Sequence, residues 1–296
     1  MNLKRLLFTL STLSALSFLL LFVPAYAQLT EGKGVFEFSG YKPLQNKPVR
    51  VFYYQPKGDV KNMPILFVMH GVLRNADTYR DNWVELAEQY KILVIVPEFS
   101  QEYFPGSASY NFGNVQAKDG SLNDESIWSF SLIDPIFDDV VKQTGSNQKK
   151  YDLFGHSAGS QFSHRFILFS KKNKSNRVIT ANAGSYTALD FDVKYPYGIK
   201  DMGFDDERLK QLFQKEVVVQ LGEKDINPND KNLPKTKEAM KQGNFRLERG
   251  KYFYEMAKAQ AERLKVPFNW KLRTVPNSAH QNEKMAVDAA KYLYGN

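Results

Sequence analysis

The sequence predicts an α/β fold with a mostly parallel central sheet and helices on both of its faces. Short apolar runs alternate with helical stretches along most of the chain, and this alternation is typical of parallel sheets. Three of the runs, at residues 65–69, 92–96 and 217–221, carry at most one polar residue each. Strands are this uniformly apolar when both faces of their sheet are covered.

The first 27 residues have the composition of a secretion signal. The start is positively charged, residues 6–23 are mostly apolar, and Ala25 and Ala27 occupy the two positions that a signal peptidase reads. We expect cleavage before Gln28, although the apolar stretch is long enough that an uncleaved membrane anchor stays an alternative. The mature protein is then periplasmic or secreted, without stable insertion in the membrane.

Residues 28–296 suit a single large α/β domain and leave little room for a second. The chain has no cysteine, so its stability outside the cell must come from the core, and a thiol nucleophile is excluded. Lys4 and Arg5 lie in the signal, so the formal charge of +8 falls by two after cleavage. Basic and acidic residues are interspersed, and no nucleic-acid partner is expected, because nucleic-acid binders concentrate their basic residues.

The elements of the sheet follow in order along the chain. Residues 34–40 and 49–56 predict an antiparallel strand pair at a sheet edge. The strand at 65–69 leads into a predicted helix at 77–90, and the next strand ends before Pro97. Further strands are predicted at residues 151–154, 177–181, 217–221 and 269–275, and further helices at 133–142, 158–169, 236–265 and 281–293.

Residues 185–214 interrupt this rhythm. They are rich in Tyr, Asp, Gly and Pro and lie between two core strands. We interpret them as a cap-like excursion over the mouth of a site, and a plain surface loop is the alternative. In either case, ligands are expected at the carboxyl ends of the parallel strands.

The turn between strand 151–154 and helix 158–169 contains a serine in the pentapeptide 155–159 (Gly-His-Ser-Ala-Gly). Such a turn holds the hydroxyl above the sheet edge, and glycines flank it because side chains there would collide with the neighbouring strand and helix. The helix N-terminus also presents unpaired N–H groups and a partial positive charge to an oxyanion. The pattern predicts that Ser157 is a nucleophile.

A nucleophilic serine needs a base, and the chain has four histidines. His70 begins a turn, His156 adjoins the nucleophile and points away from its hydroxyl, and His164 lies about two helical turns beyond it. His280 is in the loop after the last strand, where the chain order serine, acid, histidine places the base. We therefore predict His280 as the base.

The acid should follow the strand at residues 217–221. The turn after that strand contains Asp225 and is closed by Pro228. Glu223 and Asp230 compete for the role, but Glu223 is very near the strand end and Asp230 lies far beyond the turn. We predict that Asp225 orients the imidazole and stabilises the imidazolium that forms when the serine loses its proton.

Two backbone N–H groups are candidates for holding an oxyanion. The amide of Ala158 comes directly after the nucleophile, and the glycine turn after His70 lets the amide of Val72 face the same place, with that of Leu73 as a further candidate. Each such donor contributes about 3 kcal/mol to stabilising the transition state.

With these residues, the chain resembles the α/β-hydrolase superfamily over essentially all of residues 28–296, and within it the exported esterases related to polyhydroxybutyrate depolymerases. The resemblance is carried by residues 70–77 (HGVLRNAD), 104–106 (FPG), 110–115 (YNFGNV), 155–159 (GHSAG) and 181–186 (ANAGSY). It implies ester hydrolysis through an acyl-enzyme without a metal or organic cofactor. It also implies that Ser157, Asp225 and His280 are the catalytic residues.

Two features depart from enzymes of that group that attack solid polymer. The chain has no cysteine and no spare length for a separate binding domain, and His156 stands where those enzymes often have leucine. Small or oligomeric esters, including hydroxyalkanoate and aryl esters, are therefore the expected substrates.

Aromatic residues gather in the segments 100–115 and 185–199. Two interpretations stand side by side: these side chains line a substrate pocket, or they pack the loops onto the scaffold. The candidates for substrate contact are Tyr103, Phe104, Tyr110 and Tyr186.

The leading prediction is an exported serine hydrolase of carboxylic esters. A serine peptidase is the alternative enzyme, because the same three residues cleave amides. A non-catalytic binding protein on the same scaffold is the alternative outside enzymes. No His-Glu-x-x-His pattern is present, and no metal site is predicted.

Overall fold

An eight-stranded sheet forms the centre of the computed structural model, which describes residues 28–295. The predicted signal at residues 1–27 lies outside the described residues. In chain order the strands are β1 (Gly32–Phe38), β2 (Val49–Gln55), β3 (Ile65–Met69), β4 (Leu93–Glu98), β5 (Tyr151–His156), β6 (Ser175–Ala181), β7 (Glu216–Gly222) and β8 (Lys271–Val275).

The spatial order of the strands is β1-β2-β4-β3-β5-β6-β7-β8. The pairs β1–β2 and β2–β4 are antiparallel, whereas every other neighbouring pair is parallel. The predicted fold class and the antiparallel pair at the sheet edge are both confirmed.

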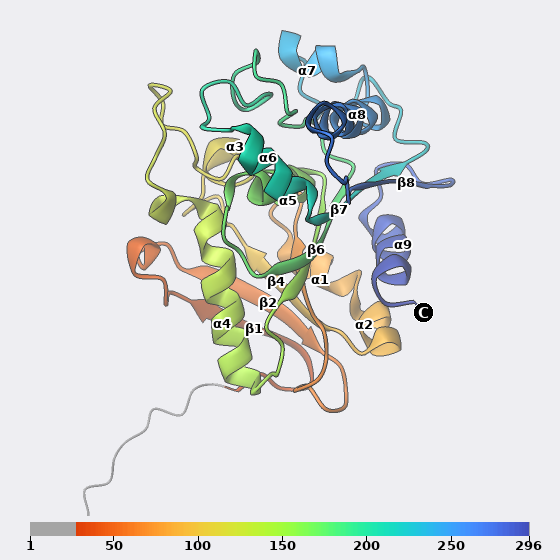
Figure 1. Cartoon of the computed structure of the whole chain (residues 1–296). Helices are drawn as coiled ribbons and strands as arrows, with labels where there is room; N and C mark the ends of the chain where they lie inside the picture. The colour runs from red at the N-terminus through yellow and green to blue at the C-terminus, as the bar shows by residue number, and fades with distance from the viewer. Residues whose placement is uncertain (1–27, 296) are drawn as a thin grey trace, which may run out of the picture.

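Helices cover both faces of the sheet (Figure 1). They are α1 (Ala76–Asp81), α2 (Val84–Tyr90), α3 (Gly106–Ser109), α4 (Ile133–Thr144), α5 (Ala158–Phe169), α6 (Asp206–Phe213), α7 (Lys237–Gln242), α8 (Arg246–Leu264) and α9 (Asn282–Tyr294), with 3-10 turns at Lys42–Leu44, Glu125–Ile127 and Ser129–Leu132. Helices α1, α2 and α9 pack on one face, and α4, α5, α6 and α8 contribute to the larger core on the other.

Strand β3 is apolar throughout because both of its faces are buried. Successive side chains of a strand point to opposite faces, so Phe67 and Met69 join the larger core while Leu66 and Val68 join the smaller one. All five residues of β3 are buried. A polar residue at any of these positions would lie in a core without water.

Two predicted helices are each divided in the structure. The helix predicted at residues 77–90 breaks at Trp83, whose side chain is fully buried and packs edge-on against Phe154. The helix predicted at 236–265 breaks at Gly243, which has a φ of 141°. L side chains rarely adopt that φ, so a glycine there ends α7 and lets α8 begin in a new direction.

The prediction that Pro97 ends its strand is wrong. Pro97 lies within β4 and pairs with Val51 of antiparallel β2, whereas the parallel pairing of β4 with β3 extends only to Ile95. Proline lacks an N–H and is tolerated where one side of the strand needs no ladder bond.

The excursion at residues 185–214 is largely packed against the scaffold. Tyr186, Leu189, Ile199 and Met202 are buried in the larger core. Its last part forms α6, which the sequence analysis did not predict. The Leu189 carbonyl accepts a hydrogen bond from Gln260 of α8, so this segment is tied to the helix that covers the sheet.

The parallel strands place the three catalytic candidates at one edge, together with His70 and Asn182. His70 follows β3, Ser157 follows β5, Asn182 follows β6, and the loops with Asp225 and His280 follow β7 and β8. Carboxyl ends of parallel strands meet at the same edge of a sheet.

In residues 28–295, none of the helices has the length and apolar character needed to cross a membrane.

Candidate active site

Ser157 occupies a sharp turn between β5 and α5. Its backbone has φ 60° and ψ −117°, a sparsely populated conformation for a residue with a side chain. The Ser157 N–H donates to the Ala181 carbonyl at the end of β6, at 3.0 Å. The strained residue is therefore fixed by the neighbouring strand, as the turn of a nucleophilic serine requires.

The flanking glycines leave room for this turn. A Cβ atom on Gly159 would lie 1.9 Å from the backbone oxygen of Met69, and one on Gly155 would lie 2.1 Å from the backbone oxygen of Gly159. Both distances are far below van der Waals contact. The prediction that side chains here would collide with the neighbouring strand and helix is confirmed.

His280 reaches the serine from the loop after β8. Its Nε2 lies 3.0 Å from the Ser157 Oγ, across 123 residues of sequence. Its side chain is 26% exposed, so one edge of the imidazole stays accessible to solvent. The distance is within hydrogen-bond range, as proton transfer from the serine requires.

Asp225 holds the other side of the same ring. Its Oδ2 lies 2.7 Å from the His280 Nδ1, and its side chain is only 3% exposed. The two competing carboxylates bind elsewhere, because Glu223 accepts from the Thr274 hydroxyl and Asp230 pairs with Arg246. Among the three predicted candidates, Asp225 is the one that the structure brings to the histidine.

The loops that carry the acid and the base are joined to each other. The Lys224 N–H donates to the Ser278 carbonyl at 2.8 Å. Asn182, at the end of β6, accepts from the Gly222 N–H through Oδ1 and donates to the Ala279 carbonyl through Nδ2. These bonds fix the distance between Asp225 and His280, and sequence reasoning did not identify Asn182.

Comparison with known proteins agrees with this geometry. No protein-family model and no curated protein matches the sequence. Among solved structures, poly(aspartic acid) hydrolase-1 from Sphingomonas sp. KT-1 is 41% identical with a TM-score of 0.86, over 90% of this chain and 100% of that chain. The chain belongs to the α/β-hydrolase family.

Other structures extend the comparison. The LpqC poly(3-hydroxybutyrate) depolymerase from Bordetella parapertussis is 29% identical with a TM-score of 0.83, over 90% of this chain and 91% of that chain. An S-formylglutathione hydrolase from Agrobacterium tumefaciens, 13% identical with a TM-score of 0.56 over 91% and 96% of the two chains, shares the fold. The predicted resemblance to the α/β-hydrolase superfamily is confirmed.

The two predicted oxyanion donors lie at the same edge of the sheet as the serine of this α/β-hydrolase. Ala158 is the first residue of α5, and Val72 follows β3, whose Met69 pairs with Gly155 of β5. Within residues 28–295, neither the Val72 N–H nor the Ala158 N–H is paired with an acceptor. Their role stays a prediction, which both free donors support.

The other three histidines of the α/β-hydrolase are buried and serve its scaffold. His70 accepts the Phe99 N–H and His164 accepts the Thr187 N–H, each through Nε2. Burial lowers the pKa of His70 to about 3 and holds the pKa of His164 well below its ordinary value. Both rings are therefore neutral near pH 7.

His156 has a contact that the sequence did not predict. Its Nδ1 lies 3.1 Å from the Tyr79 hydroxyl, and its ring centroid is 4.6 Å from that of His280. Burial, followed by the nearby charges of His280 and Arg246, holds the pKa of His156 well below its ordinary value. A neutral ring therefore packs against the imidazole that faces Ser157.

The prediction of substrate contact is wrong for three of the four aromatic candidates. Phe104, Tyr110 and Tyr186 are 2%, 0% and 0% exposed. Tyr110 stacks on His70 and donates to its carbonyl, and Tyr186 stacks on Phe253. These rings pack the loops onto the scaffold, whereas Tyr103 is half-buried and stays a candidate.

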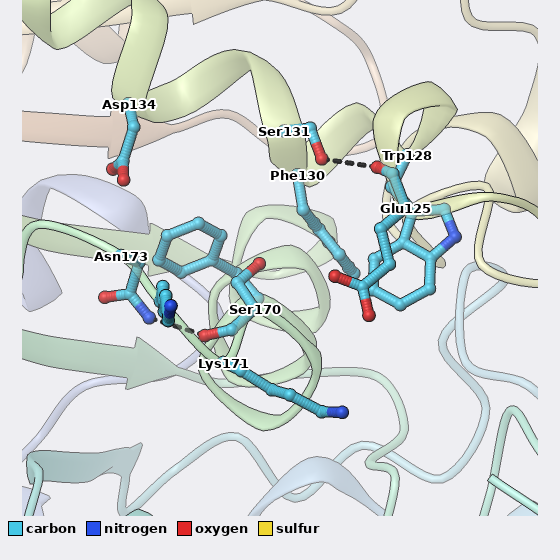
Figure 2. Close-up of a pocket in the computed structure, with 10 residues that line it drawn as sticks. Glu125, Trp128, Phe130, Ser131, Asp134, Ser170, Lys171 and Asn173 are labelled. Carbon is cyan, nitrogen blue, oxygen red and sulfur yellow. Dashed lines mark hydrogen bonds between the residues drawn. The ribbon is translucent and has the colours of Figure 1, made fainter. Parts of the chain in front are cut away.

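A pocket of about 420 Å³ in the α/β-hydrolase lies away from the serine. In Figure 2, Asp134 and Asn173 lie on one side of this pocket, and Trp128 and Glu125 lie on the other. It adjoins the C-terminal end of α5, whose 12 residues span about 18 Å from Ser157. Its position excludes it as the reaction site.

Over residues 28–295, no cluster of three or more His, Asp or Glu side chains has a metal-binding arrangement.

Proposed function

We propose that the protein hydrolyses carboxylic esters through an acyl-enzyme formed on Ser157. The observation that carries this proposal is the unbroken line of contacts from the Ser157 Oγ to the His280 Nε2 at 3.0 Å, and from the His280 Nδ1 to the Asp225 Oδ2 at 2.7 Å. Such a line lets the serine lose its proton as it attacks and lets the buried carboxylate balance the resulting imidazolium.

Each step of this reaction has a residue in a suitable place. The Ser157 Oγ attacks the ester carbonyl while His280 takes its proton, and the oxyanion is held by the Ala158 and Val72 amides. His280 then returns the proton to the departing alkoxide, which leaves as the alcohol. Water then attacks the acyl-serine while His280 takes its proton, and His280 passes that proton to the Ser157 Oγ as the carboxylic acid leaves.

Small or oligomeric esters are the proposed substrates, with hydroxyalkanoate and aryl esters among them. The likeness to a poly(3-hydroxybutyrate) depolymerase, which covers 91% of that chain at 29% identity, supports a hydroxyalkanoate ester. The side chains of Val72 and Ile226, on the loops after β3 and β7, are 40% and 49% exposed. Apolar side chains on these loops suit an acyl group with little charge.

A second candidate function is hydrolysis of amide bonds in poly(aspartic acid). The 41% identity with poly(aspartic acid) hydrolase-1, over the whole of that chain, favours it. The same acyl transfer chemistry cleaves amides, and the net positive charge of the chain suits an anionic polymer. This candidate keeps the serine peptidase alternative open in a more specific form.

Export to the periplasm or the medium is part of the proposal. The charged start, the apolar stretch and the small residues before Gln28 support it. Expression with the native N-terminus, followed by fractionation and N-terminal sequencing, tests it. Mature protein that begins at Gln28 outside the cytoplasm supports export, and full-length protein in the cytoplasm contradicts it.

The activity itself is tested with p-nitrophenyl acetate and butyrate, hydroxybutyrate oligomers and poly(aspartic acid) assayed side by side. Ser157→Ala is expected to lower kcat on the preferred substrate by about 10⁶-fold and to abolish labelling by a fluorophosphonate. Turnover of poly(aspartic acid) with no turnover of any ester would select the second candidate. A fully active Ser157→Ala protein would falsify both.

A further inference from the structure

A buried arginine touches the carboxylate that orients His280. Arg246 is the first residue of α8, and its side chain is 2% exposed. Its Nη1 lies 3.5 Å from the Asp225 Oδ1, the oxygen that His280 does not use. Asp225 therefore lies between two groups, with the imidazole on one oxygen and the guanidinium on the other.

A second carboxylate balances the arginine. The Arg246 Nη2 lies 3.2 Å from the Asp230 Oδ1, and the Asp230 side chain is 23% exposed. The contact with Arg246 lowers the pKa of Asp230, so this second carboxylate is ionised near neutral pH. The arginine thus contacts two acidic residues of the same loop, which lie five residues apart in the chain.

The chain places Arg246 by backbone contacts that do not depend on its charge. The Leu247 N–H at the start of α8 donates to the Asp225 carbonyl at 3.3 Å. Gly243, with φ 141°, separates α7 from α8 and turns the new helix toward this loop. The start of α8 is therefore docked on the acid loop even before the side chains are considered.

Acidic and basic side chains alternate in the cluster of His280, Asp225, Arg246 and Asp230. With His280 neutral, Asp225, Arg246 and Asp230 sum to one negative charge, and protonation of His280 makes the four-residue cluster neutral. Without Arg246 the same cluster would hold two negative charges before protonation. Buried charges interact strongly, so the arginine changes the net charge of the cluster that contacts His280.

We propose that Arg246 is a positioning residue of the active site, which fixes the rotamer of Asp225 and, together with Asp230, sets the pH range in which His280 is free to act as the base. This inference rests on the proposed function, because it assigns a second layer of residues to the same reaction. Its observable consequence is the midpoint of the acidic limb of the kcat/KM profile, which reports the base of the free enzyme.

Other groups around the imidazole are neutral or more distant. His156 packs on the ring and is neutral, its partner Tyr79 is a buried phenol, and burial likewise raises the pKa of Tyr186, which lies near Asp225 and Arg246. After burial, the charge of Glu283 contributes to the raised pKa of Tyr79, and Arg249 donates hydrogen bonds to the Gly184 and Gly243 carbonyls. Among the charged groups of the described residues, Arg246 is in direct contact with Asp225, and Asp230 is in direct contact with Arg246.

Three variants test the proposal through the pH dependence of kcat/KM on the ester that wild type hydrolyses best. Arg246→Gln removes the cation and is expected to raise the midpoint of the acidic limb by about one pH unit, with a loss of kcat from a mobile Asp225. Asp230→Asn leaves the cation uncompensated and is expected to lower the midpoint by about half a unit. Arg246→Lys retains the charge and should restore the midpoint while recovering only part of kcat.

The control is Arg177→Gln, which breaks a partly buried pair with Asp152 at the far end of the same sheet. It should unfold at lower denaturant concentration than wild type and keep the wild-type midpoint. An arginine that acts only by packing would give the same result at position 246, with lower stability and an unmoved midpoint. That outcome, or midpoints that move in the same direction in Arg246→Gln and Asp230→Asn, overturns the proposal.

Failure of the proposed function gives a different result. If Ser157→Ala keeps full activity, the profile reports another site and the assignment of the active site is wrong. If Ser157→Ala is inactive and the midpoints do not move, the reaction is as proposed and Arg246 has no part in it. Should Arg246→Gln fail to fold, Asp230→Asn and Arg246→Lys still decide the question.

Discussion

The turn around Ser157 and the loop around Asp225 project from the same edge of the sheet, but different contacts hold them there. The turn is fixed by backbone: two glycines whose missing side chains make room, and a Ser157 N–H bonded to the Ala181 carbonyl. The loop also has backbone bonds, such as the one from the Lys224 N–H to the Ser278 carbonyl. Charged and amide side chains hold it as well, with Arg246 on the carboxylate and Asn182 on the backbone of Gly222.

This difference has consequences for function. Backbone packing is nearly independent of pH and does not tolerate an added methyl group. A cluster of charges and amides tolerates small changes of shape but responds to protonation. The nucleophile is therefore held rigidly, whereas the groups that move its proton respond to pH, and the two halves should fail in different ways when they are altered.

The largest effect is expected at the backbone side. In Gly159→Ala the new Cβ would lie 1.9 Å from the Met69 backbone oxygen, and the end of β3 or the start of α5 must move. We expect a loss of about 3 kcal/mol in the free energy of unfolding and a loss of most activity at every pH. Urea denaturation and a pH–rate profile measure both.

Gly184→Ala is the matched control for this change. Its Cβ would meet the Nε2 of Gln161 at 3.0 Å, the end of a side chain that can shift. Its destabilisation should stay below about 1 kcal/mol. Equal stability of the two variants would show that close backbone packing does not hold the turn.

A smaller effect is expected at the side-chain side. Asn182→Ala removes the acceptor of the Gly222 N–H and places alanine at φ 52°. We expect about 2 kcal/mol lower stability, from an unpaired buried N–H and a strained backbone, and a kcat about ten-fold lower because Asp225 and His280 lose their clamp.

Asn182→Gly separates the two causes in this variant. Glycine accepts the left-handed backbone without strain but makes neither side-chain bond. It should recover part of the stability lost in Asn182→Ala and none of the kcat. Recovery of both would mean that backbone strain alone explains the loss, and the clamp between the loops would have no role.

The sequence was sufficient for the turn because the contacts that define it are local. Ser157, its flanking glycines and the helix that follows are adjacent in the chain, and the position of His280 follows from strand order. Hydrophobic periodicity also located every strand. It did not locate the break at Trp83, since an aromatic that turns into the core leaves the helical pattern nearly intact.

The acid side was only partly predictable for the opposite reason. Asp225 was identified by its loop position, but Arg246 lies 21 residues away and Asn182 lies 40 residues from Gly222. No local pattern marks a charged residue that a long-range contact buries. The burial of Phe104, Tyr110 and Tyr186 was not predicted for a similar reason, because composition does not say which way an aromatic loop residue faces.

The smallest effect per residue concerns how low pH unfolds the protein. His70, His156 and His164 have pKa values lowered by burial, to about 3 for His70. In the unfolded chain these rings titrate near 6.5, so below that pH the unfolded state binds more protons and stability falls with decreasing pH. Each ring should contribute about 1 kcal/mol of loss between pH 6.5 and 5.5, a window above the carboxylate range. Urea denaturation at pH 7.5, 6.5 and 5.5 measures the slope, and His164→Gln should reduce it by about one proton. Because two of these rings support β3 and α5, a flat stability across this range would mean that the scaffold of the nucleophile does not depend on neutral histidines.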